Sequence, residues 1–455
     1  MTEPANPDLD SRSWLERVLG AFTEVRAGES VTALLLASNI FLILTAYYIV
    51  KPVREALILS TSGGAEIKSY AAAGQAILLL GAIPIYSWLA SRYPRRMLIN
   101  SVTIFFAVCL GGFYILALAG APIAVVFFLW LGVFNLMVPA QFWAFANDIY
   151  NPETGKRLFV IVAFGASVGA VSGSYAAGHL IHFLGINQLL IVSAGVLLCS
   201  LILTNLIDTR EKTNAPSVAG QSATEQPLSK EGAFRLLLHS RYLFLIACLM
   251  LFLNWVNTTG EYILGRAVRE AAIKAIDIGS WSGNVEDYIG AFYANFFTLV
   301  NLAGLALQMF LVSRVLKYLG IRTAILILPI IALGGYLVAA FYPLLAIIRV
   351  VKIAENATDY SVQNTVREVL FLPTTRDQKY KAKQAIDTFF VRGGDVLSAL
   401  TVFAGTAVLT LSTQQFALFN ALLVLVWLTI ALLLGQQYRR LVPAEKAAEV
   451  AAEVR

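Results

Sequence analysis

The sequence predicts an all-α, polytopic membrane protein whose twelve transmembrane helices form two six-helix bundles. Of its 455 residues, 58% are hydrophobic and only 14% are charged, and the mean hydropathy is +0.71. This apolar share is well above that of an ordinary soluble domain. Apolar stretches of about 18 to 25 residues, the length that spans a bilayer, recur along the whole chain. One long polar segment, residues 207–240, separates the first six stretches from the last six.

Each predicted span is an apolar stretch bounded by charged residues or by residues typical of turns. In chain order the spans cover residues 31–50, 70–90, 97–118, 121–147, 158–182, 187–206, 241–265, 286–312, 321–341, 344–368, 383–411 and 415–437. The tenth span is unusually polar for a membrane helix, because it carries six charged side chains between residues 349 and 368.

Basic residues predict the orientation of these spans. Short cytoplasmic loops are enriched in Lys and Arg, and the links on the side of the N-terminus hold most of the 34 basic residues. The opposite links "LALAGAP", "FYPL" and "LSTQQF" hold none. We therefore expect both ends to be cytoplasmic, with 1–30 as an N-terminal segment, 207–240 as a linker and 438–455 as a tail. This topology explains the net charge of +6, so no nucleic-acid partner is expected.

The linker at 207–240 is rich in Pro, Ser, Thr and Ala, which indicates a flexible connection between two halves, 31–206 and 241–437. Corresponding links in the halves are weakly alike. "SWLASRYPRRMLI" follows the second span and "FLVSRVLKYLGIRTAIL" the eighth, and each has Ser-Arg, an aromatic residue and further basic residues. Six spans plus six, related by an axis along the membrane normal, is the arrangement of the major facilitator architecture.

The tenth span carries a polar stripe within "RVVKIAENATDYSVQNTVRE", residues 349–368. On an α-helix at about 100° per residue, six polar side chains fall within an arc of roughly 80°: Arg349, Lys352, Asn356, Asp359, Gln363 and Arg367. Facing lipid, each central charge would cost about 2.5–3.5 kcal/mol. The stripe is therefore predicted to face a water-filled cavity or partner charges. The alternative is a structural ion-pair network that locks the bundle.

Further polar groups lie in other predicted spans. They are Lys51, Arg54 and Glu55 in the first span, Asn147 and Asp148 in the fourth, Asn254, Asn257 and Glu261 in the seventh, and Asp387, Arg392 and Asp395 in the eleventh. Pro52 is expected to break the first helix locally. Charges that snorkel at helix ends and hydrogen bonds between helices are the structural alternatives. A mixed basic, acidic and amide interior favours an anionic solute.

Signatures of catalysis are missing from the sequence. It has no Gly-rich loop followed by Lys and Ser or Thr, so ATP hydrolysis is not the expected source of energy. Its three cysteines lie unpaired in apolar stretches, which indicates packing rather than a disulfide or a metal site. Gly165, Gly169 and Gly173 are spaced by four, a pattern of close helix packing rather than of nucleotide binding. We expect a chain that is not an enzyme and that needs no cofactor.

Several stretches resemble the ATP:ADP antiporter (nucleotide transporter) family of plastids and intracellular bacteria. "KPVREAL" resembles its Arg-Pro-Leu-Lys-Asp segment, and "QFWAFANDI…GKRLF" its Leu-Phe-Trp-x-Phe-Ala-Asn segment followed by Ala-Lys-Arg-Phe. "TTGEYILG" resembles its Asn-Leu-Val-Glu and places Glu261 at the glutamate. The most specific match is "DYSVQNTVREVLFLPTT…KAKQAID", which resembles Lys-Tyr-Ser-x-Phe-Asp-x-x-Lys-Glu-x-x-Tyr-Ile-Pro followed by Lys-Gly-Lys-Ala-Ala-Ile-Asp. Asp359 and Asp395 stand where the family has lysines, which reduces the expected positive charge.

The resemblance implies a divergent bacterial member of this family: a multi-pass protein of the inner membrane that exchanges nucleotides by alternating access. We expect it to be a monomer whose partners are an anionic small molecule and the bilayer. Substrate contacts are expected from Lys51, Arg54, Asn147, Asn254, Asn257, Glu261, Lys352, Asn356, Asp359, Gln363 and Arg392. Coupling or gating is expected from Glu55, Asp148, Arg367, Asp387 and Asp395.

Two other functions remain open from the residues. The first is a proton-coupled carrier of another organic anion, since acidic side chains in the predicted spans are as frequent as basic ones. The second is a membrane scaffold or sensor that transports nothing and binds a partner through the linker at 207–240.

Overall fold

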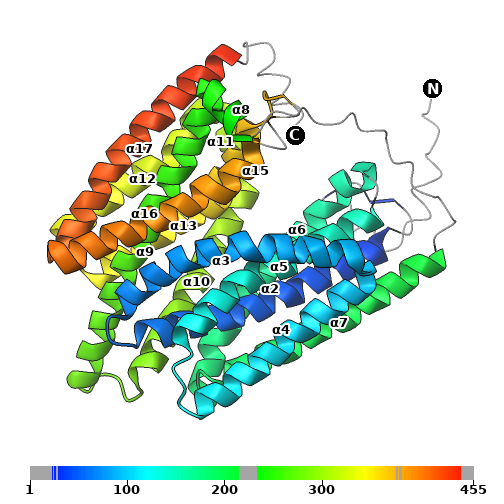
Figure 1. Ribbon diagram of the computed structural model, residues 1–455, viewed down its shortest axis with the longest axis horizontal. Helices are drawn as coiled ribbons and strands as arrows, with labels where there is room; N and C mark the ends of the chain where they lie inside the picture. The colour runs from blue at the N-terminus through cyan, green and yellow to red at the C-terminus, as the bar shows by residue number, and fades with distance from the viewer. Residues whose placement is uncertain are drawn as a thin grey trace, which may run out of the picture. The chain divides into compact units, whose positions relative to one another are not determined.

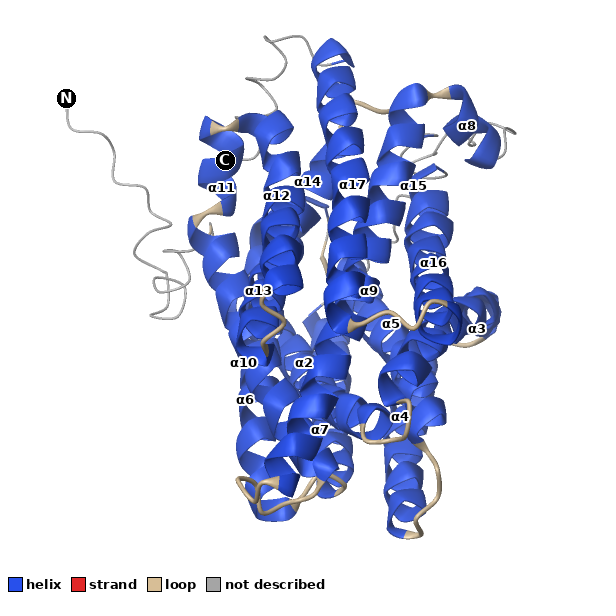
Figure 2. Cartoon of the chain, turned by 90° about the vertical axis from the view of Figure 1, so that its left-hand side faces the viewer, coloured by secondary structure: helices blue, strands red, loops and turns tan. Residues whose placement is uncertain are grey.

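The structure is a computed structural model, which describes residues 23, 25–26, 29–150, 152–214, 233–375, 378 and 382–441. Regular structure within these residues is helical, as Figure 2 shows. The helices of Figure 1 are α2 (Ser30–Leu59), α3 (Gly64–Arg92), α4 (Arg95–Leu118), α5 (Ala124–Ile149), α6 (Pro152–Leu184), α7 (Gln188–Asn214), α8 (Ala233–His239), α9 (Arg241–Asp277), α10 (Val285–Phe310), α11 (Val312–Tyr318), α12 (Gly320–Phe341), α13 (Leu345–Thr358), α14 (Asn364–Leu370), α15 (Lys383–Ala385), α16 (Val391–Phe403) and α17 (Thr413–Leu441). Some of them are joined by π-helical turns, among them η1 (Asp359–Gln363), η3 (Ile386–Phe390) and η4 (Ala404–Val408).

The predicted all-α, polytopic fold class is confirmed. Among the described residues, ten helices are long and apolar enough to cross a bilayer. The other two predicted spans correspond to the runs α13–η1–α14 and α15–η3–α16–η4, which are helical but contain π-turns. The structure is thus consistent with twelve spans. Residues 215–232 of the predicted linker, 442–455 of the predicted tail and most of 1–30 lie outside the described residues, so these segment boundaries stay predictions.

Several helices depart from the predicted boundaries. Helix α2 continues through Pro52 to Leu59, so the expected break at this proline is wrong. Val50 and Val53 beside it are buried, and packing of this kind lets membrane helices tolerate proline. Helix α3 begins at Gly64 and has Glu66 in its first turn, where a carboxylate interacts favourably with the helix dipole. Helix α9 extends to Asp277, well beyond the predicted end at residue 265.

Contacts group the described residues into two compact units. The first comprises those of Met1–Glu55, Gly81–Gly220 and Tyr293–Thr298, and the second those of Ala56–Leu80, Gln221–Phe292 and Leu299–Arg455. Each unit carries exposed apolar side chains, such as Val108 in the first and Val350 in the second. Broad apolar exposure of this kind suits contact with lipid.

In the first unit, helix α6 packs against α2 through the three predicted glycines. A Cβ atom at Gly165, Gly169 or Gly173 would lie 2.5, 2.4 or 2.6 Å from a backbone carbonyl oxygen of α2. These separations are far below van der Waals contact, so only glycine lets the two backbones come so close. The predicted helix-packing role of the three glycines is confirmed, and it follows the rule of small residues at membrane helix interfaces.

We expect Gly169→Val to lower the stability of the protein by about 1–3 kcal/mol, the usual cost of overpacking. The new side chain would meet the carbonyl oxygen of Phe41 and force α2 and α6 apart. Thermal unfolding of the purified protein in detergent measures the effect. Gly111→Ala on α4 is the matched control, because a Cβ there meets nothing within 4 Å. Equal unfolding temperatures for the two variants would contradict this account.

The start of α2 is tied to α6 by a bidentate ion pair. The Arg157 guanidinium donates to both oxygens of Glu29, over 2.9 and 3.1 Å. Partial burial raises the pKa of the Glu29 carboxyl, but the hydrogen bonds and charges of Arg157 and Arg26 together outweigh burial and leave the pKa below its ordinary value. Glu29 is therefore charged at neutral pH, and the pair fixes the N-terminal end of α2 in the first unit.

Candidate functional site

Lys352 on α13 lies at the centre of a buried group of charges in the second unit. Its side chain is 1% exposed. The ammonium Nζ donates to Oδ1 of Asn257 over 2.7 Å, and it lies 3.1 Å from Oε2 of Glu355 and 3.6 Å from Oε1 of Glu261. An ammonium group has three donors and no acceptor. The three oxygens therefore compensate a charge that would otherwise be very unfavourable in this position.

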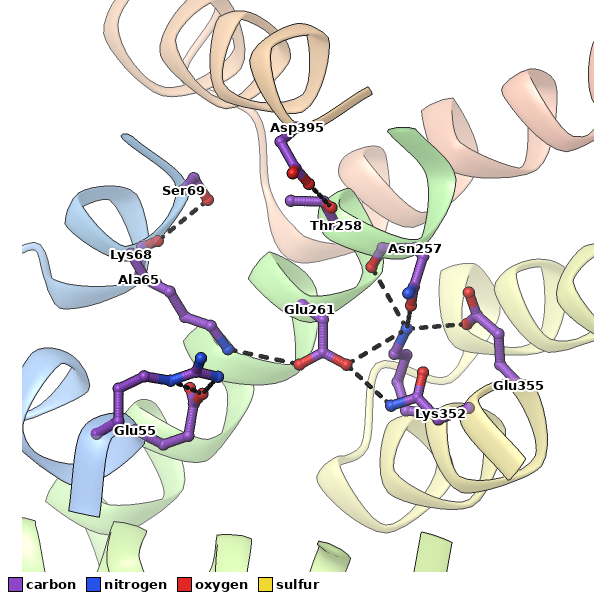
Figure 3. A network of polar contacts seen from close by, with 12 residues as sticks. Glu55, Ala65, Lys68, Ser69, Asn257, Thr258, Glu261, Lys352, Glu355 and Asp395 are labelled. Carbon is purple, nitrogen blue, oxygen red and sulfur yellow. Dashed lines mark hydrogen bonds and ion pairs between the residues drawn. The ribbon is translucent and has the colours of Figure 1, made fainter. Parts of the chain in front are cut away.

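Glu261 on α9 is shared between two lysines, as Figure 3 shows. Its Oε2 lies 3.4 Å from Nζ of Lys68 on α3, and its Oε1 faces Lys352. Asn356, one helical turn after Lys352, donates its amide to Oε1 of Glu261 over 3.1 Å. One carboxylate thus links α3, α9 and α13, and it contacts two cations that would otherwise repel each other.

Tyr336 on α12 completes this group. Its hydroxyl donates to Oε2 of Glu355 over 2.7 Å, and both side chains are buried. Gly260 on α9 makes the arrangement possible, since a Cβ there would lie 1.9 Å from the Tyr336 hydroxyl. We call these seven residues the lysine cluster: Lys68, Asn257, Glu261, Tyr336, Lys352, Glu355 and Asn356. With two lysines and two glutamates, its formal charge is balanced.

A second polar group joins α9 to α16. Asp395 accepts hydrogen bonds from Thr258 over 2.8 Å and from the Asn254 amide over 3.2 Å, and it pairs with Arg392 over 3.3 Å. Helix α16 approaches α9 closely at Gly394, where a Cβ would lie 2.7 Å from the backbone oxygen of Leu251. The predicted residues Asn254, Arg392 and Asp395 therefore form one group.

The π-turn η1 divides the predicted stripe of the tenth span. Lys352 and Asn356 precede the turn and belong to the lysine cluster. Asp359, Gln363 and Arg367 lie on or after it and line a separate cavity of about 400 Å³. A uniform α-helix, as assumed from the sequence, is wrong here, because a π-turn adds a residue to the turn and changes the direction of those that follow. We call this cavity the η1 pocket.

The predicted residues of the first span lie in the first unit. The Lys51 ammonium lies 4.9 Å from the ring centre of Tyr48 and 4.1 Å from that of Phe297, within reach of a cation–π interaction. Nε of Arg54 donates to Oε1 of Glu55 over 3.0 Å, and its guanidinium lies 4.7 Å from the ring centre of Phe128. Lys51 and Glu55 are both buried, which argues against simple snorkelling at the end of the helix.

Three predicted residues stand apart from these groups. Asn147 and Asp148 are exposed at the end of α5, where Asp148 pairs with Arg95 over 3.0 Å. Asp387 is half-buried on η3, and its Oδ1 has no hydrogen-bond partner among the described residues. The roles assigned to these three residues stay predictions.

The structure thus brings together Asn257, Glu261, Lys352 and Asn356, all of which the sequence indicates. Sequence reasoning missed Lys68 and Tyr336 and assigned no site role to Glu355. A signal for Lys68 exists, since a helix that begins at Gly64 would place this lysine inside the span rather than in the preceding link. Tyr336 gives no such signal, because it lies in an ordinary apolar stretch.

The lysine cluster is suited to reversible binding of an anion. Two ammonium groups share one carboxylate, so a phosphate or carboxylate of a solute can take its place beside either lysine by charge-assisted hydrogen bonds. Charged groups of this kind inside membrane spans typically mark a transport pathway. Among the described residues, no three His, Cys, Asp or Glu side chains are placed to hold a metal ion.

Curated relatives of the chain are bacterial nucleotide carriers. It is 23% identical over 349 residues to ADP,ATP carrier protein 1 of Chlamydia trachomatis. The aligned region covers 67% of this chain and 63% of the carrier. It is also 22% identical over 306 residues to ADP,ATP carrier protein 3 of Rickettsia felis, and this aligned region covers 59% of this chain and 58% of that carrier. The chain thus matches less than two thirds of the length of these relatives. The predicted resemblance to this family is confirmed.

Solved structures of similar fold are membrane transporters. A bacterial homologue of the lysosomal transporter Spinster has a TM-score of 0.60 at 14% identity, covering 92% of this chain and 99% of that one. The nucleoside transporter NupG has a TM-score of 0.61 at 12% identity, covering 90% and 98%. At these identities the likeness shows the fold alone. The model of the Major Facilitator Superfamily matches residues 36–354, which is more than half of the chain. The chain therefore belongs to the Major Facilitator Superfamily.

Proposed function

We propose that this chain is a nucleotide exchanger of the ATP/ADP type that works by alternating access. The observation that carries the proposal is the Glu261 carboxylate shared by Lys68 and Lys352 inside the bundle of predicted spans. Similarity to ADP,ATP carrier proteins of Chlamydia and Rickettsia supports a nucleotide as the solute. Nucleotide phosphates are strong acceptors for lysine ammonium groups.

In the proposed mechanism, the phosphates of the solute compete with Glu261 for the two lysines. When the solute leaves, Glu261 again lies between the two lysines, so their positive charges do not repel each other in the interior of the empty carrier. Each departing solute leaves the lysines to the carboxylate or to the next anion, so two solutes compete for the same two lysines, as exchange requires. Glu355 stays beside Lys352, where the Tyr336 hydroxyl holds it through a hydrogen bond of 2.7 Å.

We place the exchanger in a bacterial inner membrane, as a monomer with both termini in the cytoplasm and no nucleic-acid partner. The uneven distribution of basic residues between the links supports this orientation. An anionic nucleotide and the surrounding lipid are then its partners. Transport of this kind needs no enzymatic step and no resident cofactor.

Exchange by the purified full-length chain in proteoliposomes tests the proposal. Vesicles loaded with unlabelled ADP should take up radiolabelled ATP, whereas vesicles loaded with buffer should not, and a protonophore should leave the exchange unchanged. Uptake that does not depend on internal nucleotide and is abolished by the protonophore would instead identify a proton-coupled carrier of organic anions. If no labelled solute moves but a partner binds the linker at 207–240, the chain is a scaffold or sensor.

A further inference from the structure

Gln363 on η1 is a buried amide without a hydrogen-bond partner. The side chain is 2% exposed, and both Nε2 and Oε1 lack a partner among the described residues. An amide has two donors and an acceptor with two lone pairs, and leaving all of them unpaired in an apolar interior is costly. Such a group in a folded protein calls for an explanation, of which a bound ligand is one.

Gln363 is one of the residues that line the η1 pocket. This cavity of about 400 Å³ falls within the usual size of small-molecule sites. Its lining combines the polar residues Asp359, Gln363 and Arg367 with the apolar residues Met250 and Leu253 on α9. A few convergent polar groups among apolar ones are typical of a pocket that orients a flat organic ligand.

The charged groups around the pocket leave Asp359 available. Arg367 donates to Oδ1 of Asn364 over 3.0 Å and lies 4.0 Å from Glu368. Asp359 is half-buried and pairs with no basic side chain within 4 Å among the described residues. An ionised carboxylate only accepts hydrogen bonds. A ligand that satisfies both Asp359 and Gln363 must therefore offer an N–H donor next to an acceptor.

The backbone at this place is the π-turn η1, which runs from Asp359 to Gln363. Turns of this type occur mostly as single interruptions of α-helices and are frequent at functional sites. Here the turn separates the pocket-lining side chains from the lysine cluster that precedes them on α13. The same run of helix therefore presents two different surfaces, one charged and one suited to hydrogen bonding.

We propose that the η1 pocket binds the amino-bearing edge of a nucleobase, with Gln363 pairing with that edge and Asp359 accepting from the exocyclic amine. The amide of glutamine pairs with two groups of adenine: its oxygen accepts from the N6 amine of the base, and its NH2 group donates to N7. The thioether of Met250 and the side chain of Leu253 supply apolar contact for the ring. This assignment rests on the proposed nucleotide exchange and adds to it the recognition of the base.

Binding to the full-length protein in detergent tests the assignment with ADP, IDP and pyrophosphate. IDP carries an oxygen in place of the 6-amino group, and pyrophosphate has no base. The wild-type protein should bind ADP at least about tenfold more tightly than IDP, because IDP lacks the amino group that donates to Gln363 and Asp359, and a loss of about 1.4 kcal/mol is tenfold. Gln363→Leu should weaken ADP binding by about tenfold or more and leave pyrophosphate binding unchanged. Its thermal stability without ligand should not fall, because the substitution removes an unpartnered amide.

Gln141→Leu is the matched control. Gln141 on α5 is also buried, at 3% exposure, but the cavity beside it measures only about 10 Å³ and cannot hold a base. Its replacement should leave ADP binding unchanged. Wild-type affinity for ADP in Gln363→Leu, equal affinities for ADP and IDP, or equal losses of ADP and pyrophosphate would each overturn the base pocket while leaving nucleotide exchange intact. A wild-type protein that binds no nucleotide overturns both proposals.

Discussion

Lys352→Ala should reduce nucleotide exchange in proteoliposomes by at least about 100-fold, a loss of about 2.7 kcal/mol. Lys352 is 1% exposed and contacts the carboxylates of Glu261 and Glu355. Without the ammonium group, a phosphate of the solute loses one of its two cationic partners, and it lies near Glu355, whose carboxylate no longer has a lysine beside it. Both changes oppose binding of an anion, so uptake of labelled ATP measures their combined effect.

Loss of folding must be separated from loss of transport in this experiment. Removing one member of a buried ion pair commonly costs about 3–5 kcal/mol, because the other charge is left uncompensated. The double variant Lys352→Ala/Glu355→Ala removes both charges of the pair that are 3.1 Å apart. We expect it to regain thermal stability and to remain inactive. Lys317→Ala, at an exposed position of helix α11, should behave as the wild type in both measurements.

Recovery of exchange in the double variant would show that Lys352 serves structure rather than transport. Full exchange in Lys352→Ala alone would have the same meaning. The structural ion-pair network considered from the sequence would then be the correct interpretation of the lysine cluster. Stability and exchange are therefore measured on the same preparations.

The helices could be predicted from the sequence because their signal is local. An apolar stretch of span length predicts a membrane helix without reference to the rest of the chain, and the twelve predicted stretches correspond to helical runs. The pairing of charges could not be predicted in this way. Lys68 and Glu261 are 193 positions apart in the chain, so their contact depends on how α3 and α9 pack rather than on any motif. In addition, the second predicted span begins at residue 70, which places Lys68 in the preceding link rather than in a membrane helix.

The polar stripe illustrates the limit of periodicity. Counting at 100° per residue correctly placed Lys352 and Asn356 on one face, and both reach Glu261. The same counting placed Gln363 on that face, whereas the structure has it on η1, among the residues that line the η1 pocket. A π-turn has no compositional signature comparable to the apolar pattern of a span. The division of the stripe into a charged part and a hydrogen-bonding part therefore emerges only from the folded chain.

Glu261→Gln should also reduce exchange by about 100-fold, although the side chain keeps its size. Glu261 lies within 3.4 Å of Lys68 and 3.6 Å of Lys352, and the amide carries no charge to compensate the two ammonium groups. In the absence of solute, the two lysines then repel each other inside the bundle. A bound nucleotide relieves this repulsion, so the variant should hold ADP at least as tightly as the wild type but release it slowly.

Two measurements separate retained ADP affinity from slowed release in this variant: equilibrium binding of ADP and the rate of ATP/ADP exchange. Glu270→Gln is the matched control on the same helix, because Glu270 is 60% exposed and pairs only with Arg266 among the described residues. Surface pairs of this kind contribute little, so the control should exchange at the wild-type rate. If Glu261→Gln loses ADP binding together with exchange, the carboxylate contacts the solute directly instead of competing with it for the lysines. If Glu261→Gln exchanges normally, the shared carboxylate has no part in transport, and the proposed competition between Glu261 and phosphate is wrong.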